Sequence, residues 1–274
     1  MKLKRGQYFL FIFGILWSVI TIYPLFVSFL CSLKDNQGIF GQMFALPRTV
    51  IWQNYYDALF AAKIFRGVWN SLKLAVGTTM SVCTIALFAS YALSRDNFKF
   101  IRPLYLLFLT GVMIPIHTTI IPISKLAAQL QGANKHWMLI LVYTTFQLPQ
   151  AIFLITGYLN GVSRELDEAA IIDGCGRLGI LLRIMLPVCT PIIATVAILS
   201  FIYGYSELVF SVILLHAPEK YPISRSLMYF TGDYSIRMGP VFASIIIAVL
   251  PMIIIYLLFH ENVQRGMLAG AVKG

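Results

Sequence analysis

Charged residues are scarce in this sequence, and acidic residues are the rarest of them. Only 12% of the 274 residues are Asp, Glu, Lys or Arg, and only eleven are acidic. A soluble domain averages about 25% charged residues. Hydrophobic residues make up 59% of the chain. This balance excludes an ordinary soluble domain and indicates a membrane protein.

Sequence motifs of enzymes and nucleotide-binding proteins are also missing. No G-x-x-x-x-G-K-[ST], G-x-S-x-G or H-E-x-x-H occurs, and the four cysteines show no C-x-x-C spacing. We therefore predict reduced, buried thiols, no catalytic residues, no metal site and no cofactor in this chain. The net charge of +10 favours contact with anionic membrane lipid. The basic residues are scattered rather than clustered, so they give no indication of nucleic-acid binding.

Uncharged stretches long enough to cross a bilayer occur six times. A span needs about 20 mostly apolar residues, and it must be helical because an open strand would leave backbone groups unpaired in lipid. The predicted fold is an all-α membrane protein, a single polytopic domain over residues 1–274. A membrane-surface helix is expected within residues 34–73, before the second span. The predicted spans are about 8–33, 74–94, 103–124, 137–162, 187–215 and 238–260.

Basic flanks predict the orientation of these spans. MKLKR precedes the first span and SRDNFKFIR follows the second, and short basic flanks favour the cytoplasmic side. The first apolar run is longer than the 7–15 residues or so of a signal-peptide core, so we expect it to be retained. The prediction is a multi-pass protein of the cytoplasmic (inner) membrane with both termini in the cytoplasm.

One compact segment interrupts the apolar pattern. Residues 163–187, SRELDEAAIIDGCGRLGILLRIMLP, hold four of the eleven acidic residues. Ser163 can cap a helix whose acidic first turn suits the helix dipole, Gly174 and Gly176 can end it, and a second helix can run to Pro187. We predict a cytoplasmic helix-turn-helix between spans four and five. Its slim alanine face and acidic edges would fit a groove on a partner protein, whereas the alternative is an ordinary interfacial loop.

The spacing in this segment resembles the signature loop of binding-protein-dependent, ATP-driven import permeases. That loop reads E-A-A, then Gly four residues after the second Ala, then nine residues, then I-x-L-P. Other stretches, such as NSLKLAVGTTMSVCTIALFASYALSR and the ending RGMLAGAVKG, are similar to the smaller six-span, maltose-type permeases of the carbohydrate-uptake branch. The loop positions that match are Glu168, Ala169, Ala170, Gly174, Ile184, Leu186 and Pro187.

This resemblance implies partners and a coupling role. In that family the loop docks on a separate ATPase subunit, and ATP-driven closure of the ATPase pair switches two permeases between inward- and outward-facing states. The implied partners are a homologous second permease chain, two ATPase subunits that hold ATP and Mg, and a solute-binding protein. The residues expected to couple to the ATPase are Glu168, Ala169, Ala170, Asp173, Gly174, Ile184, Leu186 and Pro187. The tail residues expected to make a second contact are Gly270, Ala271, Val272 and Lys273.

Polar residues within the spans form a second set of candidates. A carboxylate at bilayer depth costs about 2.5–3.5 kcal/mol on insertion scales, so Glu207 is expected either near the pathway or subunit seam, or in a structural tie. The family often has Trp-Asn-Glu where this chain has Tyr205-Ser206-Glu207, and Ile-Pro where it has Val162-Ser163. A rival interpretation is an ion-coupled secondary transporter acting without an ATPase; an intramembrane enzyme is a more distant one. The pathway or seam candidates are Glu207, Tyr205, Ser206, Gln147, Tyr143 and Asn70.

Overall fold

The computed structural model describes residues 5–61, 63–96, 98–228 and 237–271. Every regular element in these ranges is helical, which confirms the predicted all-α class for this part of the chain. Its contacts divide the chain into two compact units, one formed by Met1–Phe65 and Ser226–Pro251 and the other by Arg66–Arg225 and Met252–Gly274. A single polytopic domain stays a prediction.

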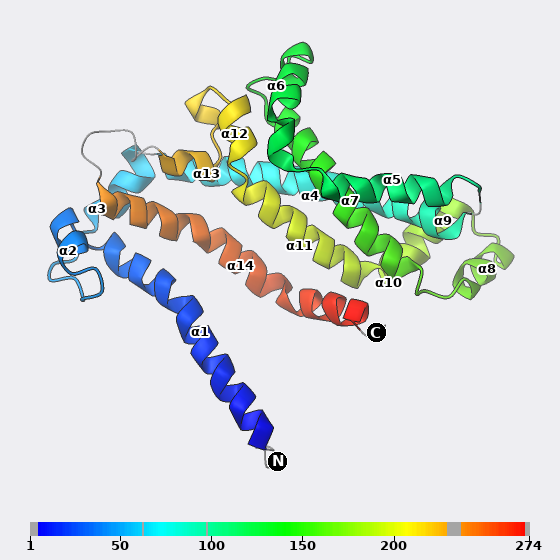
Figure 1. Ribbon diagram of the computed structural model, residues 1–274, viewed down its shortest axis with the longest axis horizontal. Coiled ribbons are helices and arrows are strands. Elements are labelled where there is room, and N and C mark those ends of the chain that lie inside the picture. Colours follow the sequence, from blue (N-terminus) through cyan, green and yellow to red (C-terminus); the bar gives the residue numbers. More distant parts are fainter. Residues whose placement is uncertain (1–4, 62, 97, 229–236, 272–274) are drawn as a thin grey trace. The chain divides into compact units, whose positions relative to one another are not determined.

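The first unit joins a long apolar helix to a loop of short helices. Asn54 holds the end of the long helix, because its buried side-chain amide donates to the carbonyls of Ser32 (2.9 Å) and Lys34 (2.8 Å). Carbonyls at a helix C-terminus lack partners within the helix, so this amide supplies what the helix cannot. The elements of this unit are α1 (Arg5–Ser32), α2 (Asn36–Gly41), α3 (Gln53–Tyr56), a π-helix (Asp57–Ala61) and the first part of α14 (Met238–Ala271) (Figure 1).

The second unit contains the remaining helices, packed around α4, α7 and α11. Val82, Ile152 and Val196, one from each of these helices, belong to one buried apolar cluster. The elements are α4 (Ile64–Arg95), α5 (Ile101–Met113), a 3-10 turn (Ile116–Thr119), α6 (Ile120–Gln129), α7 (His136–Leu159), α8 (Glu165–Ile172), α9 (Arg177–Ile180), a π-helix (Leu181–Met185), α10 (Leu186–Val188), α11 (Thr190–Ser206), α12 (Val209–Leu214), a 3-10 turn (Pro218–Lys220) and α13 (Ile223–Ser226).

Among the described residues, four helices are long and apolar enough to cross a membrane, and two bent pairs raise the number to six if each pair is one span. The straight candidates are Leu10–Ser32, Ile64–Arg95, His136–Leu159 and Met238–Phe259. The bent pairs are Ile101–Met113 with Ile116–Gln129, and Arg177–Val188 with Thr190–Ser206. The third predicted span, 103–124, falls on the first bent pair, and the fifth, 187–215, begins at the bend of the second pair; the apolar pattern alone indicated neither bend.

The helix that contains the second predicted span, 74–94, starts ten residues before it. The helix begins at Ile64 rather than near residue 74. Arg66 and Lys73, at which the sequence was divided, lie exposed on α4. Exposed charged side chains leave the backbone hydrogen bonds of a helix intact, so they do not end it. The expected surface helix is correspondingly short and ends at Ala61.

Proline explains the first bend. α5 ends at Met113, and α6 leaves at 94° after a short break. Ile114 is extended (φ −75°, ψ 118°), as the residue before a proline usually is, and Pro115 has no N–H to continue the helical ladder. Gly111 allows a close approach at this point, because a Cβ there would lie 2.7 Å from Cγ of Pro149 in α7.

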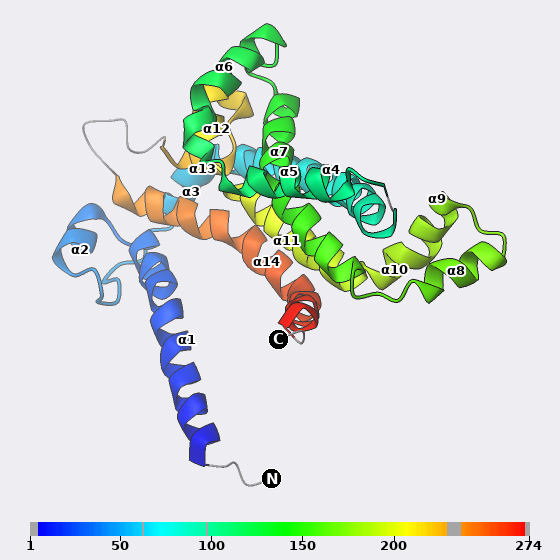
Figure 2. The same cartoon turned by 45° about the vertical axis from the view of Figure 1, so that its right-hand side comes forward.

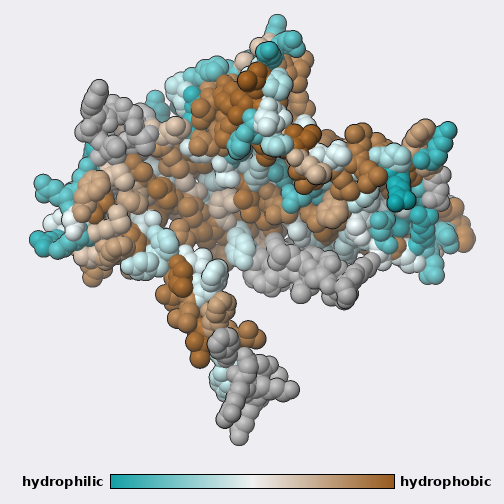
Figure 3. Space-filling view, viewed as in Figure 1, coloured by the Kyte–Doolittle hydropathy of each residue, from teal (hydrophilic) through white to brown (hydrophobic). Residues whose placement is uncertain are grey.

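Polar contacts gather at the two ends of α7. At its start, a ring nitrogen of His136 lies 2.8 Å from the carbonyl oxygen of Lys220, and at its end the carbonyl of Leu159 accepts from Arg95. The 24 residues of α7 extend over about 36 Å, enough to cross the hydrocarbon core of a bilayer. Figure 3 shows hydrophilic residues over α8 and α9 and over the tip of α6, with hydrophobic residues over α5. The second unit thus has two polar ends separated by an apolar length.

Candidate functional site

The acidic segment forms a short helix that follows α7 directly. Ser163 Oγ accepts from the backbone N–H of Glu165 at 3.2 Å, which is the expected contribution of this serine to the start of α8. Three acidic residues, Glu165, Asp167 and Glu168, lie in the first turn, where the helix dipole favours negative charge. Figures 1 and 2 show α8 beyond the end of α7, close to α9.

Gly174 turns the chain at the end of α8. The backbone N–H of Cys175 donates to the carbonyl of Ala170 at 2.9 Å, and that of Gly174 donates to the carbonyl of Ile171 at 3.0 Å. These two bonds, with φ of +79° at Gly174, form a Schellman motif. Left-handed backbone is the reason for glycine here, since a Cβ would meet nothing within 4 Å. A short helix thus lies on each side of this turn, α8 before it and α9 after it, and a coupling role for the pair stays a prediction.

The two sides of α8 differ in exposure. Glu168 and Ala169 are exposed, and Ile172 is 85% exposed. Asp167 and Ala170 are buried. Of the three acidic residues of α8, Asp167 faces the protein, whereas Glu165 and Glu168 are exposed. We define the docking face as the exposed residues of this loop, namely Glu165, Leu166, Glu168, Ala169, Ile171, Ile172 and Asp173.

The I-x-L-P end of the segment lies in a continuous helical stretch. Ile184 is half-buried and packs against the buried cluster, whereas Leu186 and Pro187 are exposed. The stretch Arg177–Val188 passes through Pro187 and bends by 79° before Thr190. Pro187 therefore belongs to the stretch before the bend and does not start the next straight helix. It lies in the first turn of α10, which begins at Leu186, and proline is tolerated in the first turn of a helix.

Glu207 lies at the break between α11 and α12. Its Oε2 accepts from the hydroxyl of Tyr143 at 2.7 Å, and its Oε1 accepts from the backbone N–H of Phe210 at 2.9 Å. Ser224 Oγ donates to the carbonyl of the same glutamate at 2.8 Å. The carboxylate thus joins α7 to the first turn of α12. Both oxygens have partners within this chain, which is the geometry of a structural tie.

The other pathway candidates are distributed around this tie. Asn70 is buried and donates to the carbonyls of Glu219 (2.9 Å) and Tyr221 (3.1 Å). Tyr205 is buried, and its carbonyl accepts from Ser71 Oγ. Ser206 is exposed and donates to its own helix, and Gln147 is half-buried. The structure brings Tyr143 and Glu207 into contact and leaves the roles of the remaining candidates untested.

The C-terminal tail lies at the edge of what the structure describes. α14 continues as a helix to Ala271, so Gly270 and Ala271 are helical, whereas Val272 and Lys273 lie outside the described residues. The expected tail contact stays a prediction.

Comparison with known proteins identifies the family. The family described as "Binding-protein-dependent transport system inner membrane component" matches residues 83–269, which include the whole of the acidic segment. The chain belongs to this family. It is a permease subunit of an ABC importer, as the resemblance of its signature loop implied.

Individual relatives cover almost the whole permease. The multiple sugar-binding transport system permease protein MsmG of Streptococcus mutans is 32% identical over 263 residues, 93% of each chain. The galactooligosaccharides transport system permease protein GanQ of Bacillus subtilis is 30% identical over 281 residues, all of this chain and 99% of its own. A crystal structure of a bacterial ABC transporter that imports the polysaccharide alginate matches with a TM-score of 0.81 at 20% identity, over 95% of this chain and 99% of that one. The likeness to the solved structure supports the fold.

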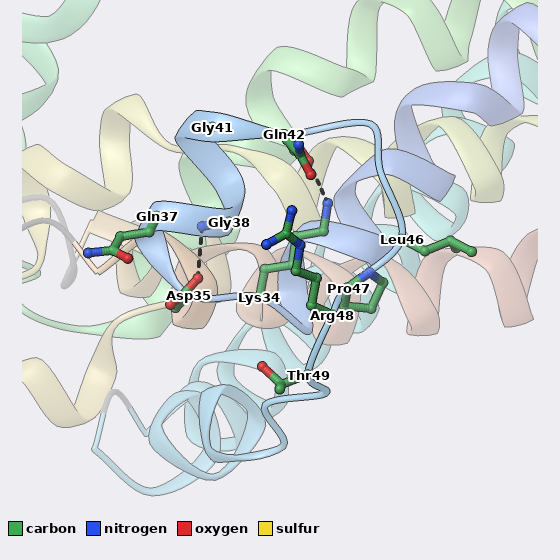
Figure 4. Close-up of a pocket in the computed structure, with 10 residues that line it drawn as sticks. All are labelled: Lys34, Asp35, Gln37, Gly38, Gly41, Gln42, Leu46, Pro47, Arg48 and Thr49. Atoms are coloured by element: carbon green, nitrogen blue, oxygen red, sulfur yellow. Dashed lines mark hydrogen bonds between the residues drawn. The ribbon is translucent and has the colours of Figure 1, made fainter.

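A pocket of about 490 Å³ opens in the first unit of the permease, beside α2. Figure 4 shows the buried ammonium of Lys34 directed at the carbonyl of Gln42, to which it donates at 2.9 Å. It also donates to the carbonyls of Met43 and Ala45. Three carbonyl partners satisfy this lysine, so its observed role is to hold the loop that follows α2.

The described part of the permease contains no cluster of His, Cys, Asp and Glu able to hold a metal ion. All four cysteines are free, two of them buried, namely Cys31 and Cys189.

Sequence reasoning missed one contact of the permease altogether. Arg95, at the end of α4, forms a buried ion pair with Asp167 of α8. The two residues are 72 positions apart, and no local pattern joins them. The one signal was that Asp167 and Ala170, three residues apart, share a helix face, which is the face that the structure buries.

Proposed function

We propose that this permease carries a sugar or oligosaccharide inward across the cytoplasmic membrane, driven by ATP hydrolysis in partner subunits that dock on α8. The similarity to MsmG and GanQ, permeases of a multiple sugar-binding and a galactooligosaccharides transport system, supports carbohydrate as the substrate class. The chain would form half of the translocation pathway, and a homologous second permease the other half. Two ATPase subunits holding ATP and Mg, and a solute-binding protein outside the membrane, would complete the importer.

The exposed docking face of α8 is the observation that supports the ATPase contact. Ile172 is 85% exposed and Ile171 is 61% exposed, beside the exposed carboxylates of this loop. Exposed apolar side chains beside charged ones are typical of an interaction surface, in which apolar groups are buried and charges set specificity. The exposed carboxylate of Glu168 lies next to the exposed Ala169. The outward side of α8 therefore combines small and apolar side chains with a negative charge at their edge.

Polar contacts at both ends of α7 support a membrane crossing by this helix, and the basic flanks of the sequence support the proposed orientation. With both termini in the cytoplasm, α8 and the end of α4 lie on the cytoplasmic side, and the 216–223 loop lies outside. Glu207 is proposed to act near the subunit seam through its tie to Tyr143 and α12. Gly270, Ala271, Val272 and Lys273 are proposed to add a second ATPase contact.

Charge reversal on the docking face tests the proposal. The permease, its sister permease and the ATPase are co-expressed, and the detergent-solubilised complex is purified through the permease. Glu168→Lys should reduce ATPase recovery and sugar uptake about tenfold or more, because a central contact becomes repulsive. Glu219→Lys makes the same charge change at an exposed site on the outer loop and should leave ATPase recovery unchanged. Wild-type recovery with Glu168→Lys would contradict docking on α8.

The substrate class has its own measurement. Vesicles holding the complete complex and the binding protein are given ATP inside and a panel of sugars, amino acids and peptides outside. We expect uptake of a carbohydrate only. Uptake by the permease chain alone, driven by an ion gradient, would contradict the ATP-driven mechanism.

A further inference from the structure

The buried side of α8 carries a charge that the docking face does not use. Asp167 is turned inward, away from Glu168 and Ile172, and its side chain is only 12% exposed. A buried carboxylate is costly unless it is paired and hydrogen-bonded. Its partners therefore indicate what holds this helix.

Asp167 is held by two residues of one other helix. Its Oδ2 lies 2.9 Å from Nε of Arg95, and its Oδ1 accepts from the hydroxyl of Tyr91 at 3.1 Å. Both partners belong to the last turns of α4 and lie four residues apart, on one face of the helix. The carboxylate thus accepts a hydrogen bond from Tyr91 through Oδ1 and forms an ion pair with Arg95 through Oδ2.

The guanidinium of Arg95 also fixes the connection between α7 and α8. Its two terminal nitrogens donate to the carbonyls of Leu159 and Val162, each at 3.2 Å. Arg164, which directly precedes α8, donates back to the carbonyl of Ser94 at 3.1 Å. A planar guanidinium with two carbonyl acceptors in fixed directions and a carboxylate beside its Nε defines a position, whereas a packed apolar contact can slide.

α4 extends from this joint to the opposite polar end of the same unit. Its 32 residues have a length of about 48 Å. Near its other end the buried side chain of Asn70 donates to the carbonyls of Glu219 and Tyr221, and Ser71 Oγ accepts from the N–H of Ile223 at 3.0 Å. One rigid helix therefore carries both the joint to α8 and the attachment of the 219–223 loop.

We propose that Arg95, Asp167 and Tyr91 form the joint through which a displacement of α8 moves α4 and, with it, the 219–223 loop. The three are positioning residues, acting through α4 rather than on substrate. The proposal rests on the proposed function, since it requires a partner that displaces α8. A buried ion pair adds little net stability compared with apolar residues of similar size, so its value here lies in a fixed direction of contact.

The experiment separates docking from transmission. In the full complex, Asp167→Asn should keep ATPase recovery, because the docking face is unchanged. It should lower sugar uptake per ATP hydrolysed about tenfold, within the usual range of a coupling between two sites. Glu168→Lys should instead lose the ATPase itself. If folded Asp167→Asn protein no longer recovered the ATPase, Asp167 would be needed for docking of the ATPase, and the proposed joint would be overturned.

A double variant guards against misfolding of the single change. Arg95→Met with Asp167→Leu removes both charges and should remain folded. We expect normal ATPase recovery, a melting temperature lowered only by the loss of the Arg95 bonds to the carbonyls of Leu159 and Val162, and uptake per ATP reduced as in Asp167→Asn. Wild-type uptake per ATP in this double variant would overturn the proposal.

A more exposed ion pair close by, between Asp96 just after α4 and Arg177 at the start of α9, supplies the matched control. Arg177 and Asp96 lie 3.2 Å apart, with side chains 84% and 33% exposed. Exposed pairs contribute little, so Arg177→Gln with Asp96→Asn should leave uptake per ATP unchanged. A loss equal to that of the buried pair would show that any charge change in this region uncouples transport, which also contradicts the joint.

Discussion

The turn at Gly174 allows a substitution series whose cost can be derived from the backbone. Gly174 has φ of +79°, and an added Cβ would meet nothing within 4 Å. Steric clash with neighbours therefore contributes nothing, and the cost is that of placing an L-residue in left-handed backbone, about 1–2 kcal/mol for alanine. Asparagine tolerates this region better, whereas a β-branched residue is worst. The expected loss of stability at this turn is smallest for Gly174→Asn, larger for Gly174→Ala and largest for Gly174→Val.

Hydrogen exchange measures this cost directly. The amide of Cys175 is protected by its bond to the carbonyl of Ala170, and that bond depends on the turn. A loss of 1–2 kcal/mol should increase local opening, and thus exchange at this amide, by a factor of about 5–30 in Gly174→Ala. Gly174→Val should exchange faster still and should abolish uptake while the protein remains inserted.

Gly176 provides the control, two residues further on. Its φ is −73°, it caps α9 and nothing lies within 4 Å of an added Cβ. Serine is a favoured residue at such a cap, so Gly176→Ser should leave exchange and uptake unchanged. If Gly174→Val kept wild-type exchange at Cys175 and wild-type uptake, the left-handed turn would not be needed and the reasoning would be refuted.

Three further predictions concern other parts of the molecule. Glu207→Gln should lower stability by about 1–3 kcal/mol, because an amide has one acceptor oxygen for the donors of Tyr143 and Phe210; an unchanged melting temperature with altered transport affinity would instead support a pathway role. In a background without native cysteines, Lys220→Cys should react with an impermeant maleimide in intact cells and Arg177→Cys should not, and the reverse would overturn the orientation. Gly204→Ala should cost about 1–3 kcal/mol of stability, because its Cβ would lie 3.0 Å from the Ala75 Cα, whereas Gly157→Ala, with nothing within 4 Å, should not reduce the melting temperature.

Local sequence predicted the acidic segment in some detail. Ser163 at the start of α8, Gly174 at its end and the second helix up to Pro187 are all present in the structure. Each of these features depends on residues a few positions apart, so short-range hydrogen bonding and backbone preference suffice to define them.

Dividing the sequence at charged residues was a poorer guide to where the helices begin and end. α4 continues through Arg66 and Lys73, because only the solvent or lipid side of a helix is affected by an exposed charge. The bend at Cys189 was also missed. An apolar composition indicates that a segment can lie in a membrane, but it does not indicate where the helix axis bends.

The sequence by itself determined the all-α membrane class, the signature loop and hence the family, because composition and fixed spacing are properties of the chain alone. Only the tertiary structure decided which residues of α8 face outward and that Asp167 pairs with Arg95. It likewise decided that Glu207 accepts from Tyr143 and Phe210. The physical reason is that an ion pair or hydrogen bond between distant residues depends on how helices pack. The sequence alone does not indicate whether an acidic residue contacts a partner protein or a guanidinium 72 residues away in the same chain.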